Sequence, residues 1–319
     1  MIETWDEPGK LRKQCPSCKK YIHARRSTCA CSHVFFKVKR DPFREESVLR
    51  DTIVTPAGAP PMKLRSTSKK AVEEIFIGKF GEAKQILIEE FLKGEEMSFF
   101  IISDGISYKI FGTAQDHKRA LEGDKGKNTG GMGAYSPSRL ESEKLEKKII
   151  KKVIEPTLKG LKDINNKFKG FLYAGLMIVD GEPFLIEYNV RMGDPETEVV
   201  IPRIENDLVE VFKAANEGTL DKIKLQITPK SAATVMLVSE GYPEAYQKDK
   251  NIFGLPKNKM IFHAGTSIEK SSLKTSGGRV MAVTSFGDNF KIALKESYKI
   301  VEKIEYDGKY YRKDIGFDL

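Results

Sequence analysis

The stretch Phe184–Glu196 constrains the chain most, because a strand pattern there runs into a strand-breaking turn. It reads F-L-I-E-Y-N-V-R-M-G-D-P-E, and its first half alternates as a strand does. Glu187 and Asn189 are two residues apart, so both point to one face, and Arg191 continues that parity. Gly193–Pro195 then ends the strand. Carboxylate and amide oxygens suit magnesium, which usually arrives with phosphates; the alternative is a solvated face of an edge strand.

Flanking patterns predict a mixed arrangement of helices and strands. Residues 171–179 and 183–189 form a hairpin through the Asp180-Gly181 turn, and this hairpin delivers the Glu187 face to the site. Further strands are expected at 98–102 and 108–112. Two helices are expected, at 142–162, with its apolar side formed by Leu145, Ile149, Val153 and Leu158, and at 207–217, ending at Gly218.

From Ser231 the pattern changes to a compact α+β unit. Strands are expected at 232–238, 260–263 and 279–285, with a turn at 273–278. A final amphipathic helix carries the stripe Phe290, Leu294, Val301 and Ile304. His263, beside a strand, is interpreted as a packed core histidine.

The N-terminal 40 residues form a basic, cysteine-containing module. They hold ten Lys/Arg against three Asp/Glu, so +7 of the formal +9 lies there. All four cysteines also lie there, namely Cys15, Cys18, Cys29 and Cys31. Such clustering in an intracellular chain favours tetrahedral zinc over disulfides, and so short a segment needs a metal to fold. The C-x-C spacing of the second pair leaves His23 and His33 open as substitute ligands.

The charge of this module admits nucleic acid as a partner, although most such basic shells are solvated surface. A proline-rich linker, residues 41–70, follows the module. No run of 18 apolar residues and no signal-peptide core occur in the sequence, so we expect no membrane association and a cytoplasmic protein.

Two segments between the linker and the hairpin suggest nucleotide and phosphate binding. Residues 86–92 read as a buried strand ending before Gly94, where the backbone of Phe91 and Leu92 would face an adenine edge and Glu96 would accept from ribose hydroxyls. Residues 123–137 form a glycine-rich segment, whose backbone N–H groups are expected to converge on an anion. It is not a Walker loop, because G-K-[ST] is absent.

Taken together, these motifs resemble the phosphoribosylamine–glycine ligases, an ATP-grasp family of purine synthesis. The resemblance is collinear over residues from about 71 to 319. The segments that carry it are 88–98, 114–119, 123–137, 173–177, 187–196, 241–243, 263–266, 277–280 and 311–316.

The resemblance implies ATP-dependent ligation of glycine to 5-phosphoribosylamine through a glycyl phosphate. Glu187 and Asn189 match the Mg²⁺ or Mn²⁺ ligands, and Arg191 matches the catalytic arginine near the transferred phosphoryl group. The positions that match the ATP-binding residues are Glu89, Glu90, Phe91, Leu92 and Glu96. The positions that match the substrate loops are Asp116, Lys118, Arg119, Asn128, Thr129, Gly130, Gly131 and Gly133.

The implied fold is α+β, with a partial ATP-grasp domain and a small C-terminal α+β domain, preceded by a zinc ribbon. The expected divisions are the zinc module at 1–40, the linker at 41–70, the partial ATP-grasp domain at 71–228 and the C-terminal domain at 229–319. The family's Rossmann-like N-terminal domain and the lobe whose lysines clamp the nucleotide phosphates have no counterpart in this sequence. We therefore expect impaired activity, or completion by a separately encoded N-terminal half.

Two alternatives stay open on the sequence alone. One is a non-catalytic nucleotide- or nucleic-acid-binding protein that retains half of a site. The other is a recombined gene without an evolved function.

Overall fold

The chain divides into two units, Met1–Phe91 and Leu92–Leu319. The computed structural model describes residues 3–5, 11–14, 21–23, 77 and 91–319. In the first unit, β1 (Glu3–Trp5), β2 (Leu11–Gln14) and β3 (Tyr21–His23) pair antiparallel in that order. The four cysteines, the linker, Glu89 and Glu90 lie outside the described residues.

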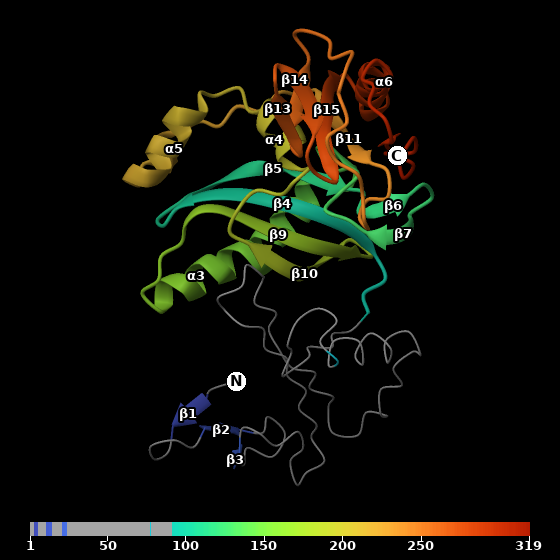
Figure 1. The fold of residues 1–319 in the computed structure, drawn as a ribbon. Coiled ribbons are helices and arrows are strands. Elements are labelled where there is room, and N and C mark those ends of the chain that lie inside the picture. Colours follow the sequence, from blue (N-terminus) through green and yellow to red (C-terminus); the bar gives the residue numbers. More distant parts are fainter. Residues whose placement is uncertain (1–2, 6–10, 15–20, 24–76, 78–90) are drawn as a thin grey trace. The chain divides into compact units, whose positions relative to one another are not determined.

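An antiparallel sheet of nine strands organises the second unit (Figure 1). Its order is β10-β9-β4-β5-β8-β11-β15-β12, with β16 paired to β11. The strands are β4 (Glu95–Asp104), β5 (Tyr108–Asp116), β8 (Gly133–Ser136), β9 (Lys169–Val179), β10 (Glu182–Asn189), β11 (Ser231–Ser239), β12 (Met260–His263), β15 (Arg279–Gly287) and β16 (Lys309–Tyr310). Two small hairpins accompany the sheet, formed by β6 (Arg119–Leu121) with β7 (Lys125–Asn128) and by β13 (Thr266–Glu269) with β14 (Ser272–Thr275).

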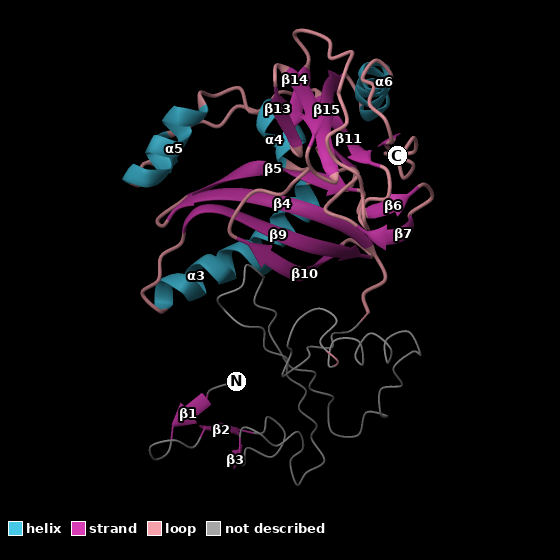
Figure 2. Cartoon of the chain, viewed as in Figure 1, coloured by secondary structure: helices cyan, strands magenta, loops and turns pink. Residues whose placement is uncertain are grey.

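One face of the first strands is covered by the helical run α2 (Glu143–Ile149), η1 (Ile150–Ile154) and α3 (Glu155–Asp163). Figure 2 labels α3 beside β9 and β10. Ser142 caps α2 by accepting from the Leu145 N–H. The middle segment is π-helical, since the Glu155 N–H bonds to Ile150 O directly before Pro156, which has no N–H to give. The apolar side of this run packs on alternate residues of β4 and β9, which form one buried cluster with it.

Shorter helices meet the opposite face, namely α4 (Thr197–Val200), η2 (Ile201–Arg203), α5 (Leu208–Glu217) and η3 (Leu220–Lys222). Asp207 caps α5 by accepting from the Val209 N–H, and Gly218 ends it with φ +76°. That left-handed conformation suits glycine because it has no Cβ. Phe100, Phe111 and the helical Val211 belong to the core on this face.

The C-terminal strands carry their own helix, α6 (Phe290–Val301), capped by Asn289. Its apolar stripe packs on β11 and β15 in a core that also takes in Met132 and Tyr135 from the β8 region. β8 pairs with both β5 and β11, so the sheet continues from one region into the other. The division into domains at 228/229 stays a prediction.

Most of the predicted elements are confirmed. These include the strands at 98–102, 108–112, 232–238, 260–263 and 279–285, the hairpin through Asp180-Gly181, and the helices at 142–162 and 207–217. The last helix is confirmed as far as Val301, and Ile304 lies beyond its end although it is buried.

Four expectations were wrong in detail. The predicted turn at 273–278 begins as strand β14, and the glycine-rich segment contains β7; both strands are short and largely polar, so they lack the apolar alternation that predicts strands. Phe91 and Leu92 lie outside any strand. His263 is exposed at the end of β12, where its Nδ1 lies 3.0 Å from Thr266 Oγ1.

Among the described residues no helix is long and apolar enough to cross a bilayer.

Candidate functional site

A polar patch occupies one face of β4, β9 and β10. In the sheet register Ser98 lies opposite Gly175, and Gly175 lies opposite Glu187, so all three face the same side. Asn189 lies opposite Tyr173 on that side too. A Cβ at residue 175 would lie 3.3 Å from Glu187 Cγ, so the glycine leaves room for the carboxylate side chain above the sheet. The other face of these strands is the apolar core under α2.

The predicted metal pair is brought together as the strand parity required. Asn189 Nδ2 donates to Glu187 Oε1 at 3.1 Å. That contact leaves Glu187 Oε2 and Asn189 Oδ1, two hard oxygens, to meet a cation, while phosphates and water would complete its shell. The donor set therefore fits Mg²⁺ or Mn²⁺. Within residues 91–319 no group of three His, Cys, Asp or Glu side chains forms a metal site by itself.

Arg191 lies just after the strand, which ends at Asn189. Its side chain is exposed, and its Nη1 donates to Met192 O at 3.0 Å. The predicted continuation of strand parity therefore stops before this residue.

Lys118 joins two of the predicted site carboxylates. Its Nζ lies 2.6 Å from Glu96 Oε2 and 2.8 Å from Asp116 Oδ1. Burial opposes the charge of the ammonium group, but Asp116 and Glu96 outweigh it and raise the pKa of Lys118. Lys118 is thus a permanent cation between two acids.

Glu196 is a buried carboxylate close to Asp116 and Lys118. It is 3% exposed, and its Oε1 accepts from Ser98 Oγ at 3.0 Å. Ser98 Oγ also lies 3.0 Å from the hydroxyl of Tyr173. Burial raises the pKa of Glu196, and the neighbouring charge of Asp116 adds to the effect.

The glycine-rich segment differs from the expected anion cradle. The N–H groups of Thr129, Gly130, Gly131 and Met132 donate to Lys118 O, Tyr242 Oη, Thr129 Oγ1 and His117 O, respectively. These amides fold the segment, so an anion there would meet other groups. Gly131 and Gly133 are buried, whereas Asn128 and Gly130 are exposed and Thr129 is half-buried.

A hollow of about 370 Å³ brings several of the predicted residues together. It is lined by Gly94, Glu95, Glu96, Gln115, Asp116, His117, Lys118, Arg119, Asp124, Asn128, Met177, Phe317 and Asp318. Glu187, Asn189 and Arg191 lie outside this lining. Phe91, expected at the adenine edge, is 82% exposed, and Leu92 is half-buried.

The C-terminal segment supplies site residues that the sequence analysis missed. Asp318 Oδ2 accepts from Tyr135 Oη at 2.6 Å, and Asp318 Oδ1 lies 3.0 Å from His117 Nε2. Burial opposes its charge, but these two partners lower the pKa of Asp318. Arg312, whose side chain is fully buried, pairs with Asp314 and with Asp124, which lines the hollow. The signal that could have found Arg312 is the motif at 311–316; Asp318 has none.

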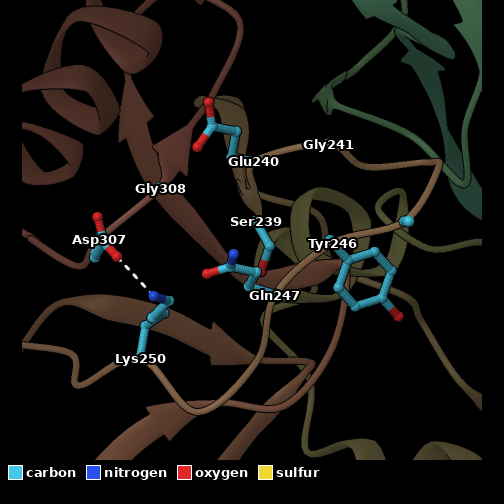
Figure 3. Close-up of a pocket in the computed structure, with 9 residues that line it drawn as sticks. Ser239, Glu240, Gly241, Tyr246, Gln247, Lys250, Asp307 and Gly308 are labelled. Atoms are coloured by element: carbon cyan, nitrogen blue, oxygen red, sulfur yellow. Dashed lines mark hydrogen bonds and ion pairs between the residues drawn. The ribbon is translucent and has the colours of Figure 1, made fainter.

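A second hollow of about 370 Å³ lies at the end of β11 (Figure 3). Its lining includes Glu240, Gln247 and the ion pair in which Lys250 Nζ lies 2.7 Å from Asp307 Oδ2. None of the predicted site residues is in this lining.

Two family models match the sequence. The model described as "Phosphoribosylglycinamide synthetase, ATP-grasp (A) domain" matches residues 45–197. The model described as "Phosphoribosylglycinamide synthetase, C domain" matches residues 232–318. The polar patch lies within the first match, and α6 with its strands lies within the second.

Relatives are named phosphoribosylamine–glycine ligase. That of Chlorobaculum tepidum is 44% identical over 259 residues, covering 79% of this chain and 61% of the relative. That of Agrobacterium fabrum is 44% identical over 251 residues, covering 77% and 59%. The chain therefore spans about 60% of the length of these relatives.

Solved structures agree with the sequence comparisons. The phosphoribosylamine–glycine ligase of Thermotoga maritima superposes with a TM-score of 0.73 and 32% identity, over 88% of this chain and 68% of that one. The biotin carboxylase domain of Hydrogenobacter thermophilus 2-oxoglutarate carboxylase superposes with a TM-score of 0.56 at 14% identity, over 76% of this chain and 52% of that one. The second likeness concerns the fold alone.

Proposed function

The chain belongs to the phosphoribosylamine–glycine ligase family, and from this premise we propose that it takes part in the ATP-dependent ligation of glycine to 5-phosphoribosylamine. The chain spans about 60% of the length of its relatives. The complete activity, its substrates and its partners are therefore proposals for this chain.

One observation carries the proposal: a cation held by two acids and a pair of metal-type oxygens share one face of the sheet. Lys118 lies between Glu96 of β4 and Asp116 of β5. Glu187 and Asn189 both lie on β10, which is separated from β4 by β9 in the sheet. The metal held by the oxygen pair would neutralise the charge of a nucleotide triphosphate and align its oxygens for transfer. Lys118 would lie with the residues that position the other substrates.

In the proposed reaction a glycine carboxylate oxygen attacks the γ-phosphorus of ATP, and the bond to the β-γ bridging oxygen breaks to release ADP. The amine of phosphoribosylamine then attacks the acyl carbon of glycyl phosphate. The bond between the acyl carbon and the phosphate oxygen breaks, phosphate leaves, and the amine loses a proton. The product is an amide, and the net conversion of ATP to ADP and phosphate, with the glycine carboxylate oxygen carried off on the phosphate, drives its formation.

The residues divide this work by position. Glu187 and Asn189 would hold Mg²⁺ or Mn²⁺, which supplies charge neutralisation on the phosphate oxygens. Arg191, exposed next to this pair, would stabilise the charge that develops on the transferred phosphoryl group. Glu96 and the segment Glu89–Leu92 would hold the ribose and adenine, although residues 89 and 90 lie outside the described part of the chain.

The remaining predicted loop residues would position glycine and phosphoribosylamine. Arg119 and Asn128 line the hollow together with Lys118, so they would meet a phosphate or carboxylate with side-chain donors. Thr129, Gly130, Gly131 and Gly133 would act through the shape of their segment, because its N–H groups already donate within the protein, to Thr129 Oγ1 and to Tyr242 Oη.

Three further points stay predictions of the sequence. They are zinc in the N-terminal module, the division into an ATP-grasp and a C-terminal domain, and a cytoplasmic location. A separately encoded N-terminal half stays a proposed partner.

The test is phosphate release that depends on glycine, ATP and phosphoribosylamine together. It is measured on the 319-residue chain, alone and mixed with the N-terminal part of a relative. Glu187→Gln should abolish release in whichever arrangement is active. Glu182→Gln is the matched control, because Glu182 lies on the same strand but pairs with Lys148 at the surface.

Two results would overturn the proposal. One is phosphate release that needs neither glycine nor phosphoribosylamine, and the other is no phosphate release in either arrangement. If Mg–nucleotide still binds in the second case, the chain is a non-catalytic nucleotide-binding protein.

A further inference from the structure

Arg279, at the start of β15, reaches from the C-terminal region to two distant segments of the site. Its Nη1 donates to Gly130 O at 2.7 Å and to Asp194 O at 2.9 Å. Its Nη2 donates to Asp194 Oδ2 at 3.0 Å. The guanidinium therefore binds two backbone carbonyls and one carboxylate, across sequence separations of 149 and 85 residues.

The peptide of Gly130 is held on both sides by the C-terminal region. Its C=O accepts from Arg279, and its N–H donates to Tyr242 Oη at 3.0 Å. Tyr242 itself lies against Gly278, where a Cβ would come 2.3 Å from Tyr242 Cδ2. The two side chains that hold Gly130 are thus fixed next to one another.

The two segments joined by Arg279 also touch directly. A Cβ at Gly131 would lie 2.3 Å from Pro195 Cδ, so the glycine-rich segment packs against the turn after β10. That turn begins two residues after Arg191, at Gly193, and contains Glu196, the partner of Ser98. The glycine-rich segment carries Asn128, which lines the hollow.

We propose that Arg279 is a positioning residue that fixes the glycine-rich segment and the Gly193–Glu196 turn relative to one another, and thereby sets Arg191 against the substrate loop. This inference rests on the proposed ligase function for its catalytic consequence. Lys118, Glu96 and the metal pair have contacts of their own, so nucleotide binding does not depend on Arg279.

The role requires an arginine. Three acceptors in different directions are met by two nitrogens of one planar fork, whereas a lysine offers a single centre with the same charge. If charge alone mattered, Arg279→Lys would restore function. If the fork matters, Arg279→Lys and Arg279→Gln behave alike.

A third variant reaches the same contact from the other side. A Cβ at Gly130 would lie 2.8 Å from Arg279 Cζ, the far end of a flexible side chain. Gly130→Ala should therefore push the guanidinium aside at little cost in folding stability. Because both changes displace the same guanidinium from Gly130 and Asp194, the double variant Arg279→Gln/Gly130→Ala should be no worse than the worse single variant.

The experiment measures three quantities on the full chain. Arg279→Gln, Arg279→Lys and Gly130→Ala should each lower kcat about 10- to 100-fold in the active arrangement, the size expected from losing charge-assisted hydrogen bonds. The Kd for Mg–nucleotide should stay within about twofold of the parent value. Amide hydrogen exchange should rise in peptides spanning 128–132 and 191–196, and stay unchanged in β4 and β9.

Lys274→Gln is the control, since Lys274 forms an ion pair with Glu269 within the β13–β14 hairpin. Unchanged exchange in 128–132 and 191–196, restoration of kcat by lysine, or additive single variants would each overturn the inference. If the parent chain shows no turnover in either arrangement, the proposed function fails, while the exchange measurement still decides whether Arg279 fixes the two segments.

Discussion

Replacing Glu198 by glutamine should change how the stability of the protein depends on pH. Glu198 lies on α4, half-buried, and its Oε2 has no hydrogen-bond partner among the described residues. Burial first, and the negative charge of Asp194 second, raise the pKa of this carboxyl from 4.5 to about 7. Arg279 lowers it, but not enough to offset the burial.

The sign and size of the effect follow from linkage. Between pH 4.5 and about 7 the folded protein keeps a proton on Glu198 that the unfolded chain has lost. The free energy of unfolding therefore falls as pH rises through this window, at about 1.4 kcal/mol per pH unit from this group. The whole window amounts to about 3 kcal/mol, fully lost above the folded pKa. Glutamine is neutral at every pH, so the variant should not lose this contribution to the free energy of unfolding.

The assay is urea unfolding of parent and Glu198→Gln at half-unit steps from pH 5 to pH 9. All other groups titrate in both proteins, so the difference between their unfolding free energies isolates residue 198. We expect the variant to gain stability relative to the parent as pH rises, with a plateau near pH 8. Glu210→Gln, an exposed substitution on α5, should give a flat difference. Parallel curves for parent and Glu198→Gln would refute the reasoning.

Three other predictions concern the metal pair, the zinc module and the C-terminal wall. Glu187→Gln should weaken Mg–nucleotide binding about 10-fold or more but leave metal-free nucleotide binding unchanged, by calorimetry; equal parent affinities with and without Mg²⁺ would contradict the metal assignment. Elemental analysis of protein purified without chelator should find one zinc per chain, and Cys15→Ser should remove it while the body stays folded; absence of zinc from the parent would rule out this module. Asp318→Asn should lower stability by roughly 2 kcal/mol at pH 7. Because the pKa of Asp318 is lowered, that loss should disappear as pH falls below the ordinary aspartate range, and an equal loss at low pH would contradict the charge argument.

Local spacing carried the parts of the site that were predictable. The parity of a strand places Glu187 and Asn189 on one face whatever the rest of the chain does, and their hydrogen bond in the structure agrees with that. Helix limits were predictable for the same reason, because Asp207 and Gly218 satisfy end groups within one turn of themselves. Each of these inferences needs only neighbours within a few residues.

The short polar strands could not be predicted in this way. Lys125–Asn128 has four exposed residues, and Ser272–Thr275 has one buried residue, so neither shows the alternation that burial of one face produces. Each forms because a partner strand lies across a tight turn, which is a matter of backbone pairing. The interpretation of His263 as a core residue failed because only the first half of its strand is partly buried, and His263 lies at the exposed end.

The contacts that assemble the site could not be predicted from local sequence patterns, for a different reason. Arg279 and Asp318 are each satisfied by groups far along the chain, and two of the Arg279 bonds go to backbone carbonyls that every residue possesses. No residue type at the receiving position therefore signals the contact. Since Arg279 and Asp318 both come from the C-terminal region and both reach the segments around Lys118 and Gly130, that region acts as part of the site. A substitution that loosens its packing on the β8 strand should reduce turnover before it unfolds the sheet, because the contacts it controls have few alternatives and the nine-stranded sheet has many.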